Sequence, residues 1–456
     1  MLDDPSSAAA DSSLKAKALQ YVWHPFQRPS EYRDRQYVFC SGRGPYVTDS
    51  SGREYLDAIS GLWNVNFGYS EKRISDAVSA QLMRMPFASL IVASHEPAIQ
   101  LAEAIASRTP AGLEVSFFTS GGSEAVESAI KIARHAALRR GQAARRNIVA
   151  LRRSYHGMSY GALSATGIAE DRWQYGAMLS DTIHAPGYQE FSDRADPTTD
   201  ALAALHKTIE FLGSHTCAAI IAEPILGAGG MHPSPPGYLR GVRDLCDRIG
   251  ALLIFDEVVS GWGRCGKMFA ADLYGVAPDM LVLAKGMSGG YAPLGAVVVH
   301  RAIYELFDGH DDNTFMHGFT YGGSPAGCAA ALASLSILES DDLLIKIEAD
   351  GKWLHDAMEA ELAPLPYVGA IRGAGLMLGV DLVLPDGTGR PATPEFGAAV
   401  RREARDAGVI IRPTYGGATF NFAPPFICSR GELERIVSTT KAAILKAASE
   451  STFVHA

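Results

Sequence analysis

The chain has 456 residues, of which 47% are hydrophobic and 20% are charged, and these values predict a large globular protein with an extensive buried core. Its formal net charge of -9 excludes the strongly basic surface that nucleic acid binders carry. No uninterrupted apolar segment reaches the roughly 18 to 20 residues that a membrane-spanning helix needs. We therefore expect a soluble protein with neither a nucleic acid nor a membrane as its partner.

The cysteines and the first residues of the chain indicate its compartment. The six cysteines are scattered without a C-x-x-C pair, which predicts neither a disulfide framework nor a metal site. Residues 1–13 are acidic and rich in small side chains, so they lack the basic and apolar regions of a signal peptide. We expect a cytoplasmic protein whose N-terminal residues form a loose tail.

Helical and strand-like segments alternate through the first two thirds of the chain. Amphipathic patterns predict helices at 70–85, 95–107, 123–139 and 236–249. Short apolar runs predict strands at 115–119, 147–151, 218–222, 252–255 and 280–284. This alternation is typical of an α/β fold with a mainly parallel sheet and helices on both faces.

From residue 325 onward the pattern changes to that of a smaller α+β domain. The predicted elements there are a long helix from Pro325, strands at 371–380 and 419–422, and helices at 394–407 and 430–448. We predict three parts: an N-terminal segment (1–65) that contributes to the small domain, a large domain (66–330), and a C-terminal small domain (331–456).

An acid and an amine stand at the ends of two predicted strands. Asp256 follows the run 252–255, and Lys285 follows the run 280–284. Pyridoxal phosphate chemistry requires these two groups, because a lysine amine forms the Schiff base and a carboxylate keeps the pyridine nitrogen protonated. An ion pair that caps two strands explains the same residues equally well.

Other features fit a flat, phosphorylated ligand. A predicted strand passes through Gly121 and Gly122 into a helix, where backbone N–H groups bind anions. A helix capped by Ser123 is the simpler explanation. Tyr155 and Val258 also follow predicted strands, where each could cover one face of a planar ring, although core packing explains them as well.

Taken together, these segments resemble the class III pyridoxal-phosphate-dependent aminotransferases, the fold type I group that includes the ω-amine:pyruvate transaminases. The resemblance runs nearly end to end and is carried by Gly61-Leu62-Trp63, Gly121-Gly122-Ser123-Glu124, Tyr155-His156-Gly157, Ala222-Glu223-Pro224, Asp256-Glu257-Val258, Ala284-Lys285-Gly286, His317-Gly318-Phe319-Thr320-Tyr321 and Ile411-Arg412-Pro413. It implies a large domain with a mainly parallel seven-stranded sheet and a smaller α+β domain.

The resemblance also implies roles for individual residues. Lys285 is the Schiff-base lysine and proton shuttle, and Asp256 holds the pyridinium nitrogen of pyridoxal 5'-phosphate. The other implied cofactor-binding residues are Gly122, Ser123, Tyr155, His156, Glu223, Val258 and Thr320. Thr320 would reach the cofactor of a neighbouring subunit, which implies a homodimer or a dimer of dimers.

Four residues are candidates for substrate contacts, besides Tyr155. Arg412 follows a short apolar run, and its guanidinium could grip a carboxylate through two parallel hydrogen bonds. A salt bridge between the two domains is the alternative. In similar enzymes the segments that correspond to Phe26 and Trp63 line the amine pocket, and Ile91 lies in a loop where some relatives carry aromatic residues.

The implied activity is transfer of an amino group from an ω-amino acid or primary amine to a keto acid, with pyruvate favoured, in two half-reactions through pyridoxamine phosphate. Segments 23–26 and 315–318 also resemble diaminopelargonate aminotransferase, which uses a specialised donor. A racemase or decarboxylase on the same fold stays open as an alternative. A regulator that binds pyridoxal phosphate without catalysis is disfavoured, because the N-terminal segment is too short and acidic for a DNA-binding domain.

Overall fold

The computed structural model describes residues 5–27, 33, 37–309, 313–414 and 416–450, with side chains from residue 11 onward. A seven-stranded sheet lies at its centre, in the order β4-β12-β11-β10-β7-β5-β6. The strands are β4 (Leu113–Thr119), β12 (Gly295–His300), β11 (Met280–Leu283), β10 (Leu252–Asp256), β7 (Cys217–Ala222), β5 (Asn147–Leu151) and β6 (Thr182–Ala185). Only β12 runs antiparallel to its neighbours, so the expected mainly parallel seven-stranded sheet is confirmed.

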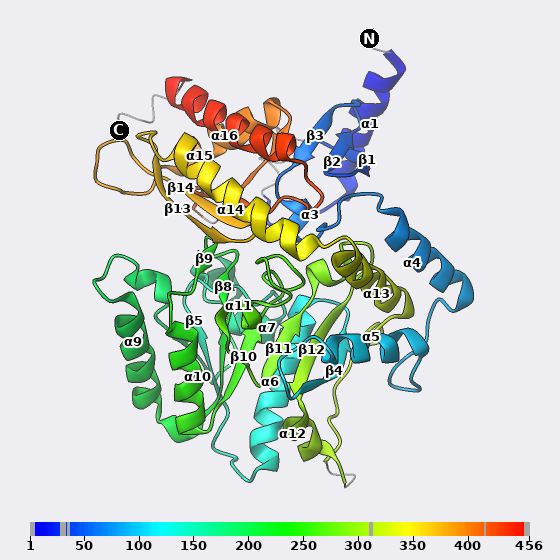
Figure 1. Cartoon of the computed structure of the whole chain (residues 1–456), viewed down its shortest axis with the longest axis vertical. Helices are drawn as coiled ribbons and strands as arrows, with labels where there is room; N and C mark the ends of the chain where they lie inside the picture. Colours follow the sequence, from blue (N-terminus) through cyan, green and yellow to red (C-terminus); the bar gives the residue numbers. More distant parts are fainter. Residues whose placement is uncertain (1–4, 28–32, 34–36, 310–312, 415, 451–456) are drawn as a thin grey trace.

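Both faces of this sheet are buried, which explains why its strands read as continuous apolar runs. Successive residues of β10 point to opposite faces: Leu253 and Phe255 join one hydrophobic cluster, whereas Leu252 and Ile254 join another. Helices α6 (Gly122–Arg139) and α7 (Tyr160–Ala165) cover the second face. The first face is covered by α5 (Glu96–Ala106), α9 (Pro197–Leu212), α10 (Tyr238–Ile249) and α13 (Pro325–Ser340) (Figure 1).

Two four-stranded sheets lie above the central sheet in Figure 1. One contains β13 (Val368–Ala374), β14 (Met377–Leu382), β17 (Thr419–Phe422) and β16 (Arg412–Pro413). The other contains β1 (Phe39–Arg43), β2 (Tyr46–Asp49), β3 (Glu54–Asp57) and β15 (Val409–Ile410). Because β15 pairs with β3, an early and a late segment of the chain share one sheet.

The remaining elements complete the chain. The helices are α1 (Pro5–Tyr21), α3 (Ser60–Trp63), α4 (Lys72–Arg84), α8 (Ala169–Arg172), α11 (Ala270–Tyr274), α12 (Arg301–Tyr304), α14 (Leu343–Leu362), α15 (Pro394–Asp406) and α16 (Arg430–Glu450). Short 3-10 turns and one small hairpin are η1 (Trp173–Tyr175), η2 (Tyr188–Phe191), η3 (Ser214–Thr216), η4 (Lys285–Ser288), η5 (Glu305–Phe307), β8 (Ile225–Leu226) and β9 (His232–Pro233). Within the described ranges, no helix combines the length and the apolarity needed to cross a bilayer.

The sequence-based elements of the central sheet agree with the structure, but three expectations outside it are wrong. The expected loose tail is largely helix α1, in which Lys15 pairs with Asp11 at a spacing that stabilises helices. The expected long helix from Pro325 is two helices, because Asp342 adopts a left-handed conformation with a φ of 50°. The expected strand 371–380 is a hairpin of β13 and β14.

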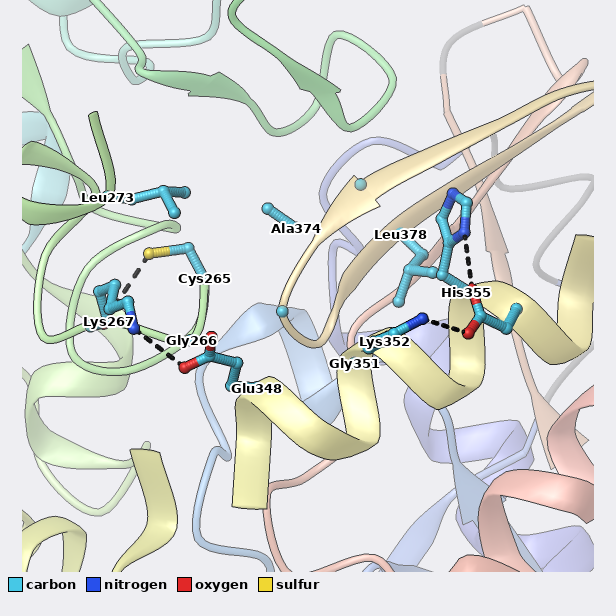
Figure 2. A pocket seen from close by; sticks show the side chains of 13 residues that line it. Cys265, Gly266, Lys267, Leu273, Glu348, Gly351, Lys352, His355, Ala374 and Leu378 are labelled. Carbon is cyan, nitrogen blue, oxygen red and sulfur yellow. Dashed lines mark hydrogen bonds and ion pairs between the residues drawn. The ribbon is translucent and has the colours of Figure 1, made fainter. Parts of the chain in front are cut away.

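The turn between β13 and β14 explains why the expected strand 371–380 is interrupted. Gly375 has a φ of +54°, and a Cβ there would lie 2.5 Å from the carbonyl carbon of Cys265. Figure 2 shows this turn between the Cys265 loop and α14. We expect Gly375→Ala to lower the free energy of unfolding by about 2 to 4 kcal/mol, because it adds both a strained φ and a steric overlap.

Urea denaturation of the wild-type protein and of the variant would measure this loss of stability. Gly387→Ala is the matched control, since Gly387 has a φ of +74° but, apart from Gly387 and its two chain neighbours, no described residue has a heavy atom within 4 Å of the place that the added methyl group would take. Gly387→Ala should lower the free energy of unfolding by about 1 kcal/mol, because it adds only backbone strain. Equal losses in the two variants would contradict the steric argument.

Candidate active site

A cavity of about 660 Å³ opens where the parallel strands end. Segments that follow β4, β5, β7, β10 and β11 all contribute to its wall, as ligand sites of α/β sheets do. The structure brings together most of the residues predicted from sequence: Phe26, Trp63, Gly122, Ser123, Tyr155, His156, Glu223, Asp256, Val258, Lys285 and Arg412. Residues from the early and late parts of the chain therefore meet the central sheet at one site.

Ile91 and Thr320 do not line this cavity. Both are exposed, Ile91 by 73% of its surface. They belong to neighbouring loops, because a Cβ on Gly318 would lie 3.8 Å from the Ile91 side chain. Any contact of these two residues with a cofactor or substrate would have to be made in the cavity of another subunit.

The N-terminus of α6 forms one wall of the cavity. Gly121 is the N-cap residue in an extended conformation, and no side chain caps the helix. The Ser123 hydroxyl instead accepts a hydrogen bond from the Met158 N–H at 3.1 Å, so the capping explanation for Ser123 does not hold. A Cβ on Gly122 would lie 3.2 Å from the Val258 methyl groups. The uncapped end of α6 therefore faces the cavity, beside the closely packed Val258. Free N–H groups at a helix end are what an anion site requires.

Asp256 is held rigidly at the end of β10. Its Oδ2 lies 2.8 Å from Nδ1 of His156, and its Oδ1 accepts the Val258 N–H at 3.1 Å. Because a carboxylate only accepts hydrogen bonds, we assign the imidazole proton to Nδ1. The buried Nε2 of His156 has no hydrogen-bond partner among the described residues. One side of the carboxylate is thus fixed by protein groups at the cavity wall.

Lys285 begins η4 with a φ of 45°, a strained conformation for a lysine. Burial lowers the pKa of its amine to about 8, although the negative charges of Asp256 and Glu223 oppose this shift. Burial also raises the pKa of Glu223 to about 7. The Glu223 carboxylate accepts the N–H groups of Tyr155 at 2.8 Å and Gly227 at 2.9 Å. An amine with this pKa can both take and release a proton near neutral pH.

Trp63 lies near two of the cationic side chains that line the cavity. The Lys285 amine is 5.1 Å from the centre of the indole ring, and the Arg412 guanidinium is 5.7 Å from it. Within the described part of the chain, Arg412 forms no salt bridge that would explain its position. Among the described residues, Arg412 therefore does not form the bridge between domains that the sequence left open, and it lines the cavity.

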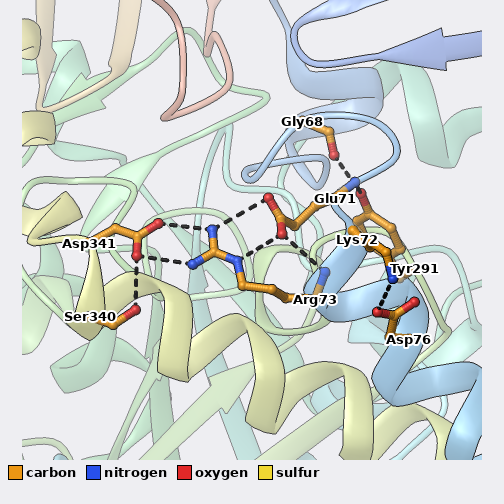
Figure 3. A network of polar contacts seen from close by, with 8 residues as sticks. All are labelled: Gly68, Glu71, Lys72, Arg73, Asp76, Tyr291, Ser340 and Asp341. Carbon is orange, nitrogen blue, oxygen red and sulfur yellow. Dashed lines mark hydrogen bonds and ion pairs between the residues drawn. The ribbon is translucent and has the colours of Figure 1, made fainter.

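Tyr291, a residue of the cavity wall, forms hydrogen bonds with the segment that precedes α4. Its hydroxyl donates to the Gly68 carbonyl at 2.9 Å and accepts the Glu71 N–H, as Figure 3 shows. Arg73 continues this network by bridging Glu71 and Asp341, each at 2.8 Å. The lining residue Tyr291 is thus tied by two hydrogen bonds to the segment 68–71.

Sequence reasoning missed several polar residues that line the cavity, among them Tyr291, Arg401 and Asn421. Asn421 lies opposite Arg412 in the β16–β17 pair, and its buried Oδ1 has no hydrogen-bond partner within the described ranges. A polar residue inside an apolar strand was the available signal for Asn421. Arg401 lies on the charged helix α15, where no pattern distinguishes it from its neighbours.

The cavity thus combines an amine of lowered pKa, a fixed carboxylate, an uncapped helix end and an arginine. A family model described as "Aminotransferase class-III" matches residues 29–444. The chain belongs to the class III aminotransferase family. As a class III aminotransferase it is an enzyme, a transaminase that depends on pyridoxal phosphate.

Several named aminotransferases are similar over most of their length. The adenosylmethionine-8-amino-7-oxononanoate aminotransferase of Nitratidesulfovibrio vulgaris is 37% identical, over 97% of this chain and 83% of that protein. The omega-aminotransferase of Caulobacter vibrioides is 35% identical, over 93% of this chain and 97% of that protein. The pyridoxal-phosphate-bound structure of an amine transaminase from an uncultivated Pseudomonas species has a TM-score of 0.89 at 36% identity, covering 94% and 99% of the two chains.

The lowered pKa of Lys285 can be tested directly. Competitive labelling of the cofactor-free protein with acetic anhydride, from about pH 6 to about pH 11, should show a midpoint near pH 8 at Lys285. Mass spectrometry would quantify the label. Asp256→Asn should move the midpoint lower, because it removes a charge that favours the protonated amine. A midpoint near the ordinary lysine value of about 10.4 would contradict the burial argument.

Proposed function

We propose that the protein transfers an amino group from an ω-amino acid or another primary amine to a keto acid, with pyruvate as the favoured acceptor. The observation that carries this proposal is the placement of Arg412 beside Lys285 on the ring of Trp63. An amino group that reacts near Lys285 places a keto acid carboxylate within the same cavity as Arg412. When the amine donor has no carboxylate, the Arg412 guanidinium stays near the indole ring of Trp63.

The cavity residues fit pyridoxal phosphate. The N–H groups at Gly122 and Ser123 would hold the phosphate, Asp256 would keep the ring nitrogen protonated, and Tyr155 and Val258 would cover the ring. The buried, unpartnered Nε2 of His156 and the uncapped helix support this fit. When bound, the cofactor supplies a carbonyl that accepts the amino group and a ring that delocalises negative charge.

The protein groups supply binding and proton transfer. Lys285 takes a proton from the substrate carbon and later releases it. A pKa of about 8 suits both proton transfers. His156 orients Asp256 through its Nδ1 hydrogen bond. Glu223, anchored by two backbone N–H groups, positions the strand ends around the ring. In the second half-reaction the keto acid binds to Arg412 and the same steps run in reverse.

We also propose that the protein works as a cytoplasmic homodimer. Exposed apolar side chains gather on the loops around Ile91 and Thr320: Phe87, Leu90, Ile91, Val92, Met316 and Tyr321. A patch of this kind on one protein is typical of an interface. In a two-fold dimer Thr320 would reach the cavity of the second copy.

The dimer proposal gives a measurable result. Light scattering after size exclusion should give twice the mass of one chain, and Ile91→Asp should weaken the association by at least about tenfold because it buries an unpaired charge. Leu445→Asp is the control, since Leu445 is exposed on α16, away from these loops. A monomeric wild type would contradict the proposal.

The visible spectrum of the cofactor-loaded protein tests the proposed function. ω-Amino acids, diamines, simple amines and S-adenosylmethionine would be added one at a time without any keto acid. Loss of the yellow absorbance, restored by pyruvate, would support the proposal and rank the donors. Loss with S-adenosylmethionine alone would favour the diaminopelargonate type of reaction instead. Racemisation or release of carbon dioxide without loss of absorbance would overturn amino transfer.

A further inference from the structure

Asn421 of β17 has a buried side-chain amide whose oxygen is unpaired. The residue is 1% exposed, and none of the described residues forms a hydrogen bond to its Oδ1. Its neighbours on the strand, Phe420 and Phe422, pack into the hydrophobic core on the other side of the sheet. A buried amide that gives up its bonds to water and gains none in return lowers stability. Packing alone therefore does not explain an asparagine at this position.

The residue that faces Asn421 across the strands is Arg412. The two are direct partners in the antiparallel β16–β17 pair, so their side chains leave the same face of the sheet, with Cβ atoms about 5 Å apart. Both side chains line the active-site cavity. A guanidinium carries five N–H donors, and the amide oxygen of Asn421 is an acceptor. The sheet therefore places an unused acceptor beside Arg412.

The segment before Trp63 ties the indole ring to the same strand. The Ala423 N–H donates to the Ala58 carbonyl at 2.8 Å, and the Ala423 carbonyl accepts the Ser60 hydroxyl at 2.7 Å. Trp63 itself has a φ of 61°, which is unfavourable for a bulky residue and persists only where the surroundings hold it. The Arg412 guanidinium lies 5.7 Å from the centre of this ring. Arg412 thus has two anchored neighbours, an aromatic ring and an amide.

We propose that Asn421 is the positioning residue of Arg412. When a keto acid is bound, the Asn421 oxygen accepts one N–H of the guanidinium, and other N–H groups of the guanidinium hold the carboxylate. The hydrogen bond to Asn421 comes from the arginine, because an ionised carboxylate has no hydrogen to donate. This inference rests on the proposed function and adds to it the residue that sets the selectivity for acids.

A neutral amide suits this role better than an acid would. The amide orients the cation without neutralising it, so the positive charge of Arg412 stays available to the substrate. An aspartate at position 421 would instead form an ion pair with Arg412 and compete with the keto acid. Asn421→Leu, which keeps the branched shape but removes the acceptor, and Asn421→Asp therefore test orientation and charge separately.

Two small acceptors, pyruvate and propanal, test this selectivity with one amine donor, because only pyruvate has a carboxylate. Asn421→Leu should lower the ratio of kcat/KM for pyruvate to kcat/KM for propanal by at least about tenfold, mainly through a higher KM for pyruvate. Asn421→Asp should lower the ratio further, and Asn421→Thr should keep part of it, since a hydroxyl oxygen can accept the same N–H. An unchanged ratio in Asn421→Leu would overturn the inference.

Melting temperatures distinguish this role from a structural one. Asn421→Leu should melt at or above the wild-type temperature, because it removes a buried amide oxygen that has no partner among the described residues. The matched control is Asn147→Leu: Asn147 is also buried, but its Nδ2 donates to the Thr216 hydroxyl at 2.7 Å, and it does not line the cavity. That control should melt below the wild type and keep the ratio of the two acceptors. A melting temperature of Asn421→Leu below that of the wild type would overturn the inference.

Calorimetry separates this inference from the proposed function. Propionate neither gives nor accepts an amino group, and the cofactor-loaded wild type should bind it at least about tenfold more tightly than propionamide. Asn421→Leu should lose most of this preference. A preference that is absent in the wild type, or unchanged in the variant, would overturn the inference even if amino transfer is observed. A preference that depends on Asn421, in a protein that transfers from no donor, would support the positioning role and overturn the proposed function.

Discussion

Lys285→Ala is expected to keep its fold but to lose turnover by about four orders of magnitude or more. The variant lacks the amine that links the cofactor and moves the proton. Its fold should persist, because the Lys285 side chain makes no hydrogen bond or ion pair within the described residues, and its amine lies 5.1 Å from the centre of the Trp63 ring. Removal of an amine whose pKa is lowered by burial should even raise the stability of the cofactor-free protein near neutral pH.

Turnover of an amine with pyruvate, together with thermal melting, would measure both effects. The control is Lys267→Ala, which removes a lysine from an exposed ion pair with Glu348 at 2.9 Å. Its turnover should stay within about twofold of the wild type, because exposed pairs contribute little. If Lys285→Ala retained substantial turnover, the assignment of the reacting amine would be wrong.

Arg264→Met is expected to lower the free energy of unfolding by about 3 to 5 kcal/mol, the largest loss of stability we predict. Arg264 is fully buried and donates to the carbonyls of Leu376 at 3.1 Å and Pro424 at 2.7 Å. Its second nitrogen donates to Ser60 and Asn66, and its guanidinium lies 4.6 Å from the Phe426 ring. Methionine fills much of the volume but leaves these buried acceptors without a donor.

Arg301→Met serves as the matched control for this variant. Arg301 forms an exposed ion pair with Glu114 at 3.1 Å, so its loss should cost about 0.5 kcal/mol or less. Urea denaturation of the loaded proteins would compare the two. Similar small losses would show that Arg264 is dispensable for holding the sheets together.

The central sheet and the placement of Asp256 and Lys285 at one cavity could be predicted from sequence, because both follow from local patterns. A strand buried on both faces is a short apolar run, and its functional residue comes where the run ends. β10 and β11 are neighbours, so their carboxyl ends bring Asp256 and Lys285 to one edge.

Other features depend on long-range contacts that no local pattern records. The segment 371–380 reads as one strand, and only the fit of Gly375 against Cys265 shows the turn. Arg401 is one of several charged residues on α15, and its place on the cavity wall follows from how that helix packs. The surface position of Ile91 and Thr320 likewise depends on the folded loops.

The pairing of β15 with β3 has a consequence for the synthesis of the protein. Val409 and Ile410 complete this sheet by pairing with Leu56 and Asp57, and Arg412 follows two residues after Ile410. A ribosome releases a chain from its N-terminus onward, so the segment around Trp63 waits for almost the whole polypeptide before its partner strand emerges. Until then an edge of β3 is open to incorrect pairing. The nascent chain therefore acquires its substrate pocket only at the end of translation, and shortened chains that stop before residue 409 should accumulate as aggregates rather than as partly active enzyme.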